Sequence, residues 1–389
     1  RHPGASRIAV QRVLKLQLCI ALPFLVLSAF VATSIWNEVE LSLLVVCASI
    51  AFGQIMSYPH KAMLRAVGEA RIESGLKLLE RLLTTVFYWI FLTNGYNSPT
   101  IYACGFSIGV FISLIGTLCI GEWYSRSDDS NLPNDWKSNK SLVIAALPFA
   151  ITLGVLPYVT KLQKFLLAGF SNYEDVGLYH VAQLAWVAGL MLPQAMRAAL
   201  LPYLGEVRNS EHRFARRMSL AHHWTLAILP IGLVAGHTIV YFAIPQFFDA
   251  EYSSAIHIFD ILLAGWAMTL LAIPWYVALQ AGNNPWRFTL LITMIVVVSL
   301  IAGWLLIPEY GVMGAAWASL IGCCIMLSAS KLLCGDEDFI TDGLAMVCVA
   351  TCYFLSIESW LAAIGLITVI PAKNSIEILL AQRHSFEEE

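Results

Sequence analysis

Long apolar runs, each followed by a short polar segment, extend along almost the whole chain. An apolar helix of about 20 residues spans a bilayer, whereas the strands of a membrane barrel are about half that length. We therefore predict α-helical spans rather than barrel strands, and the last two are the shortest. Twelve spans are predicted, at 13–36, 41–58, 75–93, 100–121, 142–170, 176–203, 222–244, 255–280, 288–307, 312–333, 340–356 and 359–372.

The composition supports a membrane protein. Of the 389 residues, 58% are hydrophobic and 13% are charged, against about 45–50% and 25% in soluble domains. The mean hydropathy is +0.71. One soluble core could not bury this much apolar surface, so the sequence predicts an all-α polytopic membrane protein.

Basic residues predict the orientation of the spans. All but three of the 23 Lys and Arg residues precede or open the first span, or lie on alternate connections and at the ends of the spans beside them. The opposite connections contain no Lys or Arg, at 37–40, 94–100, 171–175, 245–254, 307–311 and 357–360. Because cytoplasmic loops are enriched in basic residues, we expect both ends of this chain to be cytoplasmic. The basic run 206–217 is predicted to be a solvated amphipathic loop that touches lipid head groups.

A polar linker and an internal repeat suggest the domain organisation. We expect four spans in residues 1–122, a cytoplasmic linker at 123–141, a six-helix bundle at 142–334, and two further spans with a cytoplasmic tail at 335–389. Aligning Gly68 with Gly282 gives an offset of 214 residues and places Tyr96 on Tyr310. The fifth span then has no counterpart, so the repeat predicts two helices missing before Arg1.

Several segments carry a resemblance to a known superfamily. They are LRAVGEAR (64–71), KFLLAGFSNYEDVGLYHVAQ (164–183), PQAMRAALLPYLGEV (193–207), LQAGNNPWRFTL (279–290) and IPEYGVMGAAWASLIG (307–322). In order and spacing the chain resembles the polysaccharide and O-antigen flippase branch of the multidrug/oligosaccharidyl-lipid/polysaccharide exporter superfamily. The resemblance implies two six-helix bundles that face each other across a central cavity, often followed by two extra helices. It also implies a bacterial inner-membrane protein without the first two helices of its first bundle.

Three basic residues lie within apolar spans instead of on connections: Lys161, Lys164 and Arg197. A charge at the bilayer centre costs at least about 2.5 kcal/mol. The two lysines are three residues apart and share a helix face, about 14 and 9 Å from the end of their span. They could line a water-filled cavity and attract a diphosphate, snorkel to the interface, or pair with a carboxylate. Arg197 could anchor the cytoplasmic interface or lie at the inner mouth of the cavity.

Two other polar residues are candidates for ion coupling. His237 and Asp260 lie near the outer ends of the seventh and eighth spans, where they could relay protons or only cap helices and contact water. The resemblance implies an acidic residue close to position 163 in many members, where this chain has Gln163. A coupling role at position 163 would therefore lack the carboxylate that those members have.

The substrate follows from the resemblance, which implies a lipid-linked oligosaccharide (a polyprenyl-diphosphate saccharide) flipped to the outer leaflet for surface polysaccharide or O-antigen synthesis. Its expected partners are this substrate, membrane lipids and other polysaccharide assembly proteins. A drug/cation antiporter, a membrane-embedded glycosyltransferase or polymerase, and a structural partner in the same pathway are the alternatives. Because no nucleotide-binding, hydrolase or metal-site motif is present, we expect no enzyme activity, cofactor, metal or nucleic-acid partner, and we interpret the nine cysteines as apolar filling.

Overall fold

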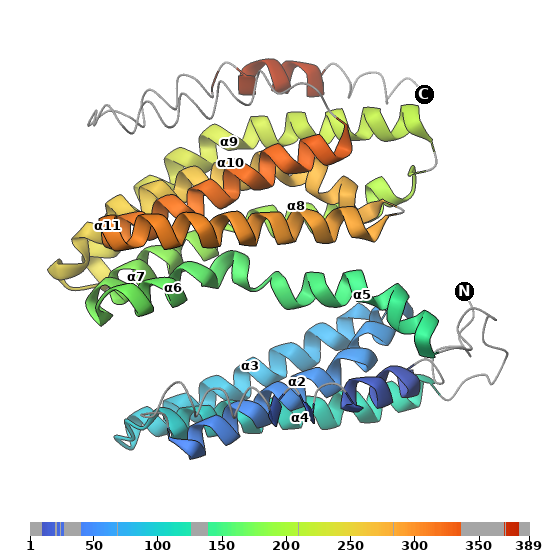
Figure 1. Ribbon diagram of the computed structural model, residues 1–389, viewed down its shortest axis with the longest axis vertical. Coiled ribbons are helices and arrows are strands. Elements are labelled where there is room, and N and C mark those ends of the chain that lie inside the picture. The colour runs from blue at the N-terminus through green and yellow to red at the C-terminus, as the bar shows by residue number, and fades with distance from the viewer. Residues whose placement is uncertain are drawn as a thin grey trace. The chain divides into compact units, whose positions relative to one another are not determined.

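The computed structural model describes residues 10–19, 22–23, 25–26, 40–67, 69–125, 139–208, 210–282, 284–335, 369 and 371–380. The regular secondary structure of these residues is helical (Figure 1), which confirms the all-α prediction. Residue contacts divide the chain into two compact units, residues 1–142 and residues 143–389. Each unit is described by itself below.

Three long helices form most of the first unit: α2 (Leu41–Val67), α3 (Ala70–Thr93) and α4 (Pro99–Ser125). Helices α2 and α4 pack side by side, and the Ser49 and Ser107 hydroxyl oxygens lie 3.0 Å apart between them. The prediction placed the start of the third span at residue 75, which was too late. Because α3 begins at Ala70, the charged residues Arg71 and Glu73 are part of a helix and not of a connection.

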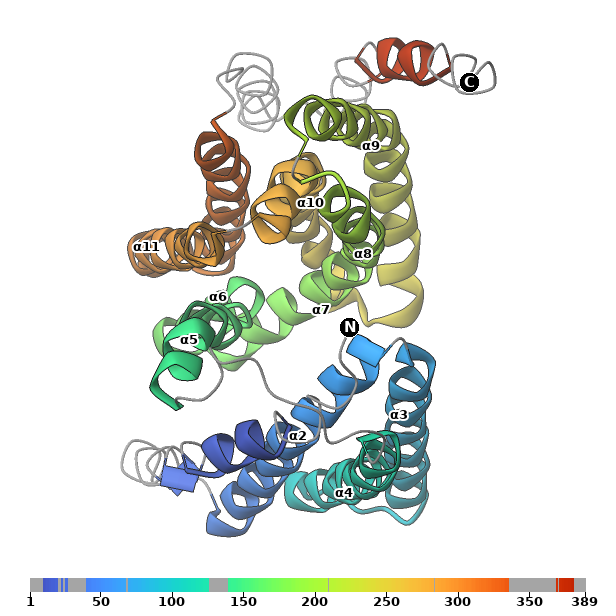
Figure 2. The ribbon, with the colours of Figure 1, turned by 90° about the vertical axis from the view of Figure 1, so that its right-hand side faces the viewer.

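The second unit is built around one buried helix. It contains α5 (Asn139–Val155), α6 (Tyr158–Phe170), α7 (Tyr173–Gly189), α8 (Met191–Gly205), α9 (Glu211–Phe247), the short 3₁₀ helix η2 (Ala250–Ser254), α10 (Ala255–Ala281) and α11 (Pro285–Cys334). Helices α7, α8, α9 and α11 all pack against α10, as Figure 2 shows, and α10 is buried along almost its whole length. Its Trp266 donates a hydrogen bond to the Gly189 carbonyl oxygen at 2.9 Å and fills the space beside Gly232, where a Cβ atom would collide with the indole ring.

Two predicted spans are each formed by two consecutive helices, and one long helix reverses direction and forms two predicted spans. The predicted fifth span is α5 followed by α6, which are separated at Leu156 and Pro157, because proline has no backbone N–H to continue the helix. The predicted sixth span is α7 followed by α8. Helix α11 reverses direction at Gly311 (Figure 1), where φ is 53° and ψ is −127°. Its two halves match the predicted ninth and tenth spans, and only glycine adopts such a backbone conformation readily.

Length and composition mark six helical segments of the described residues as able to cross a membrane: Leu41–Leu64, Pro99–Tyr124, Tyr173–Gly205, Glu211–Phe247, Ala250–Ala281 and Pro285–Cys334. The predicted spans from 41–58 to 312–333 all coincide with described helices. The span at 13–36 is described only in part, and those at 340–356 and 359–372 lie almost wholly outside the described residues.

The prediction of a loop at 206–217 was wrong in its second half, because α9 already begins at Glu211. The Arg217 guanidinium donates to the Tyr203 carbonyl oxygen and to a Glu206 carboxylate oxygen, the latter at 3.2 Å. These bonds join the start of α9 to the end of α8. They hold the second half of the basic run in the first turns of α9, so this half is helical.

Candidate functional site

Two antiparallel helices, α6 and α7, position the predicted lysines. Ser171 and Asn172 alone separate these helices, and the Asn172 side chain caps α7 by accepting a hydrogen bond from the Asp175 N–H at 2.8 Å. Helices joined by so short a turn run back alongside each other. Lys164, six residues before the end of α6, therefore lies level with His180 of α7, and the Lys164 Nζ contacts the His180 Nδ1.

A buried glutamine sets the rotation of α6. Gln163 and Leu167 are the buried residues of this helix, and the Gln163 Nε2 donates a hydrogen bond to the Ser299 carbonyl oxygen of α11 at 3.0 Å. Gln163 also packs against Gly303, which has no side chain to displace it. With this face fixed against α11, Lys161 is exposed and Lys164 is half-buried.

Lys161, Lys164 and His180 form what we call the cationic cluster. The Lys164 ammonium donates to the His180 ring, which can accept a hydrogen bond at Nδ1 only as a neutral imidazole. Neither lysine pairs with a carboxylate of any residue that the structure describes. Pairing with a carboxylate was one of the three explanations for the two lysines. Within the described part of the chain, this explanation is excluded.

His180 was missed by the sequence analysis. The signal that could have found it was the short turn at 171–172, which pairs positions on α6 with positions on α7 by their distance from the turn. A second contact agrees with the same pairing, because the Gln183 amide donates to the Thr160 carbonyl oxygen. Hairpin geometry thus identifies neighbours that helix periodicity alone does not.

Arg197 lies apart from the cationic cluster. Its Nε donates a hydrogen bond to the Gln280 Oε1 at 2.9 Å, and its guanidinium lies 5.4 Å from the centre of the Tyr276 ring. It lines a cavity of about 140 Å³ between α8, α10 and α11, and neither lysine lines that cavity. The Gln280 bond ties Arg197 to the last turn of α10 and gives it a fixed position.

The predicted pair of coupling residues does come together. The His237 Nδ1 and Asp260 Oδ1 are 2.7 Å apart, and their side chains are 18% and 6% exposed. His237 is on α9 and also stacks on Tyr241, with ring centres 6.0 Å apart. Asp260 is on the buried helix α10, so its carboxylate has a specific partner rather than a position at an open helix end.

The first unit contains a deep carboxylate that the sequence analysis did not single out. Glu80 lies ten residues after the start of α3, and its side chain is 4% exposed. The Lys61 Nζ of α2 is 4.0 Å from one of its carboxylate oxygens. The sequence signal was present, because Glu80 falls inside the predicted span 75–93, but its basic neighbours Lys77 and Arg81 were counted with the connection before that span.

The structure therefore does not gather all five predicted residues into one site. Lys161 and Lys164 share the cationic cluster, Arg197 lines a separate cavity, and His237 and Asp260 form a pair between α9 and α10. Within the described part of the chain, no group of three or more His, Cys, Asp or Glu residues could hold a metal ion.

The helix order, the broken helices and the reversal at Gly311 define a fold that is found in polytopic transporters. No protein-family model and no curated protein matches the chain. Solved structures do match it, and they include a lipid II flippase and several multidrug and toxin extrusion (MATE) transporters, one of which is described as a member of the multidrug/oligosaccharidyl-lipid/polysaccharide (MOP) superfamily.

One match is the lipid II flippase MurJ in an inward closed conformation, with a TM-score of 0.66 and 14% identity over 96% of this chain and 84% of that chain. A second is a mutant of the Vibrio cholerae MATE transporter VcmN, with a TM-score of 0.65 and 15% identity over 85% of this chain and 78% of that chain. A third is an outward-facing multidrug resistance MATE transporter of the MOP superfamily, with a TM-score of 0.65 and 14% identity over 86% of this chain and 79% of that chain. At these identities the likeness establishes the fold, and the function has to be argued from the site.

Proposed function

We propose that this protein is a bacterial inner-membrane flippase, which moves a lipid-linked oligosaccharide from the cytoplasmic to the outer leaflet for surface polysaccharide or O-antigen synthesis. The observation that carries the proposal is the cationic cluster, whose two lysines have no carboxylate partner among the described residues. The fold shared with the lipid II flippase MurJ supports it, because that protein also acts on a lipid-linked substrate.

The charge of the cluster suits a diphosphate. A lysine ammonium is a compact charge that binds phosphate well. Two opposite unit charges 4 Å apart attract each other by about 4 kcal/mol at an effective dielectric constant of 20. Because neither Lys161 nor Lys164 is neutralised by a described carboxylate, a bound anion would supply the missing charge, whereas a cationic drug would be repelled.

His180 would change from hydrogen-bond acceptor to hydrogen-bond donor when the ligand binds. In the structure it accepts a hydrogen bond from Lys164, and it can do so only as a neutral ring. A diphosphate beside Lys164 would compete for the ammonium and favour a protonated His180 that donates to the phosphate. In this mechanism, Lys161 and Lys164 hold the head group and His180 adjusts to its arrival.

Transport would follow alternating access, in which the polar head group crosses through a cavity while the polyprenyl tail stays in the bilayer. The break between α5 and α6 at Pro157 supplies a point at which the helix that carries the lysines can bend. Arg197 would assist at the cytoplasmic side, where it lines a small cavity beside Tyr276. The His237–Asp260 pair would couple transport to an ion gradient.

A drug/cation antiporter is the second candidate function. The lysines of the cationic cluster argue against it, because they would repel a cationic drug, but buried acidic groups argue for it. Glu80 and Asp260 are both buried carboxylates, and buried acids are what an antiporter would use to bind cations or protons. The MATE structures that share this fold keep the alternative open.

Cells that lack the full gene distinguish the two functions. The measurement combines the amount of lipid-linked saccharide in the inner leaflet, the amount of polysaccharide at the surface, and the minimum inhibitory concentrations of cationic drugs. A flippase predicts that the intermediate accumulates inside while surface polymer disappears. Normal surface polymer together with new drug sensitivity would replace the flippase proposal with the antiporter.

A further inference from the structure

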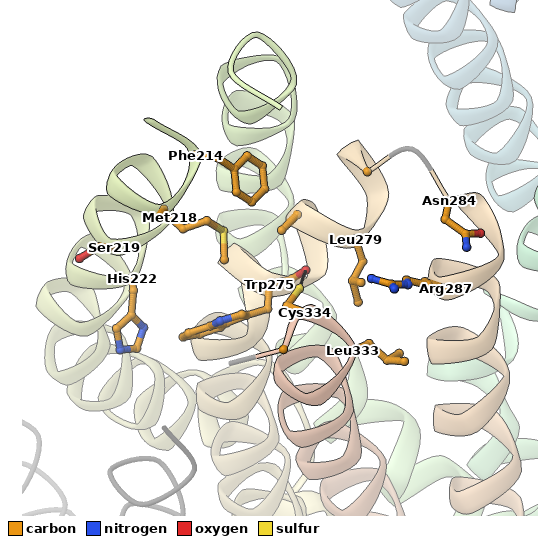
Figure 3. A pocket seen from close by; sticks show the side chains of 14 residues that line it. Phe214, Met218, Ser219, His222, Trp275, Leu279, Asn284, Arg287, Leu333 and Cys334 are labelled. Atoms are coloured by element: carbon orange, nitrogen blue, oxygen red, sulfur yellow. Dashed lines mark hydrogen bonds between the residues drawn. The ribbon is translucent and has the colours of Figure 1, made fainter. Parts of the chain in front are cut away.

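A large cavity in the second unit is lined by residues of α9, α10 and α11 (Figure 3). Its volume is about 720 Å³, and it lies between the start of α9, the end of α10 and both ends of α11. None of the residues already discussed as a transport site lines it. Figure 3 shows Arg287 extending from the start of α11 toward Leu279, and His222 lying beside Trp275.

The cavity combines apolar walls with positive charge. Phe214, Met218, Leu279 and Leu333 supply hydrophobic surface, whereas Arg287 and His222 supply nitrogen donors. None of the lining residues that the structure describes is an Asp or Glu. The Arg287 guanidinium makes no ion pair with any described residue, so its charge is available to a ligand.

A buried lysine and three helix ends lie close to the cavity. Lys331 is 3% exposed, and its ammonium lies 4.3 Å from the centre of the Trp275 ring that forms part of the wall. The C-terminal ends of α10 and α11 also reach the cavity, and each contributes about half a negative charge. The N-terminal end of α11, capped by the Asn284 side chain, contributes about half a positive charge. With the full charge of Arg287 added, the balance over these described groups is positive.

The position of the cavity along α9 fits the level of lipid head groups. The first two turns of this helix are polar and basic (EHRFARR, 211–217), and its apolar part follows from about Trp224. The cavity residues Met218 and His222 lie at the transition between these parts. In a helix that enters a bilayer, such a transition marks the interface, where phospholipid phosphates are found.

We propose that this cavity binds an anionic phospholipid of the adjacent leaflet, with the phosphate held by Arg287 and the apolar part of the lipid against Phe214, Met218 and Leu279. The ligand is a bilayer lipid rather than the transported substrate, so the proposal does not depend on the proposed function. Binding of this lipid requires both the positive charge and the apolar walls of the cavity. A zwitterionic lipid would lack the net negative charge, and a soluble phosphate would lack the apolar tail.

The test uses the purified full chain, stripped of lipid in detergent and titrated with phosphatidylglycerol or phosphatidylcholine, with bound lipid counted by native mass spectrometry. We expect phosphatidylglycerol to bind more tightly than phosphatidylcholine. Arg287→Gln should weaken phosphatidylglycerol binding about tenfold, which corresponds to about 1.4 kcal/mol. Ala215→Phe, which places a ring in the cavity without changing charge, should weaken it as well.

Arg213→Gln is the matched control, because Arg213 is exposed on the same end of the unit and does not line the cavity. It should leave binding within twofold of the unchanged protein. Equal losses in Arg287→Gln and Arg213→Gln would show general surface attraction and would overturn the proposal. Full displacement of phosphatidylglycerol by inorganic phosphate at equal concentration would also overturn it, because the occupant would then be a soluble anion. Unchanged binding in both Arg287→Gln and Ala215→Phe would place the lipid elsewhere.

Discussion

The two units hold their membrane-embedded charges in different ways. In the first unit, the Lys61 ammonium on α2 lies 4.0 Å from the Glu80 carboxylate on α3, so opposite charges face each other across a helix pair. In the second unit, Lys161 and Lys164 lie on one face of α6, where Lys164 contacts His180 and neither lysine pairs with a described carboxylate. A paired charge can serve structure alone, whereas a charge without an opposite partner calls for a ligand or for water. This difference is why we place the substrate's head group in the second unit.

The packing around the helices that carry these charges also differs between the two units. The second unit surrounds the buried helix α10, and α6 is held against α11 by the Gln163 hydrogen bond. In the first unit, a small group of buried hydrophobic residues around Met63 and Leu64 closes one end of the described bundle. Sites on well-packed helices keep their geometry within narrower limits than sites on loops. The cationic cluster therefore has the support that a binding site needs.

The largest expected effect comes from removing both lysines of the cluster. Each loses a charge-assisted hydrogen bond worth about 1.5 kcal/mol, so Lys161→Gln/Lys164→Gln should lower transport about 100-fold. The readout is surface polysaccharide per cell, normalised to the amount of protein in the membrane. Lys161→Arg/Lys164→Arg keeps the charge and should retain a measurable part of the activity. Wild-type surface polymer in the glutamine variant would show that the cluster does not bind the head group.

The next effect compares the two buried ion pairs. His237→Phe leaves the Asp260 carboxylate buried without its 2.7 Å partner and should lower the free energy of unfolding by about 3 kcal/mol. Lys61→Met should cost less, about 1–2 kcal/mol, because the Lys61–Glu80 separation of 4.0 Å gives a weaker bond to lose. Thermal unfolding of the purified protein in detergent measures both.

The double variant His237→Phe/Asp260→Leu is the control for this pair, since replacing both partners by apolar groups removes the unpaired charge and should restore most of the stability. If Lys61→Met is instead the more damaging change, the first unit depends on its ion pair more than the second does. The 4.0 Å pair would then be the stronger structural interaction of the two, and the ranking by separation would be wrong.

Alanine substitutions at two glycines should have smaller effects on stability, and the two effects should have opposite signs. A Cβ at Gly232 of α9 would collide with the Trp266 ring, so Gly232→Ala should destabilise the second unit by about 1–3 kcal/mol. A Cβ at Gly75 of α3 meets nothing within 4 Å, so Gly75→Ala should stabilise the first unit by about 0.5–1 kcal/mol through helix propensity. The same unfolding measurement applies, and destabilisation by Gly75→Ala would mean that this face of α3 is covered.

The smallest effect concerns the glutamine that orients α6. Gln163→Leu loses the hydrogen bond to the Ser299 carbonyl oxygen, a kind of bond worth about 0.6 kcal/mol between membrane helices. It also removes a buried Oε1 that has no hydrogen-bond partner among the described residues, which offsets part of the loss. Unfolding free energy should change by less than about 1 kcal/mol. A transport loss as large as that of the double lysine variant would assign Gln163 a direct role at the substrate.

The fold class was predictable because runs of about 20 apolar residues leave few alternatives to membrane helices. The breaks were partly predictable, since Pro157 and Gly311 mark two of the points where helices end or reverse. The start of α3 was not, because the charged residues Arg71 and Glu73 made the first turns of this helix resemble a connection. Charges on a helix can be neutralised by a neighbouring helix, and hydropathy along the sequence does not record that neighbour.

The candidate site was predictable only for residues that are anomalous by themselves. Lys161 and Lys164 stand out in an apolar run, so sequence alone identified them. Their contact with His180 and the pairing of His237 with Asp260 depend on packing between helices, which a single sequence does not state. The link between Arg197 and Gln280 depends on the crossing of α8 and α10 and was equally invisible.

The most direct test of the central claim is a flipping assay in liposomes that contain the purified protein and a fluorescent lipid-linked disaccharide. The protection of that disaccharide from an impermeant quencher reports on which leaflet it occupies. The account predicts rapid exchange with the unchanged protein and exchange near the protein-free rate with Lys161→Gln/Lys164→Gln, while the Arg208→Gln/Arg213→Gln control, with the same loss of charge at exposed positions, stays fast. Equal exchange in the lysine variant and the unchanged protein would contradict the claim that the cationic cluster carries the diphosphate head group.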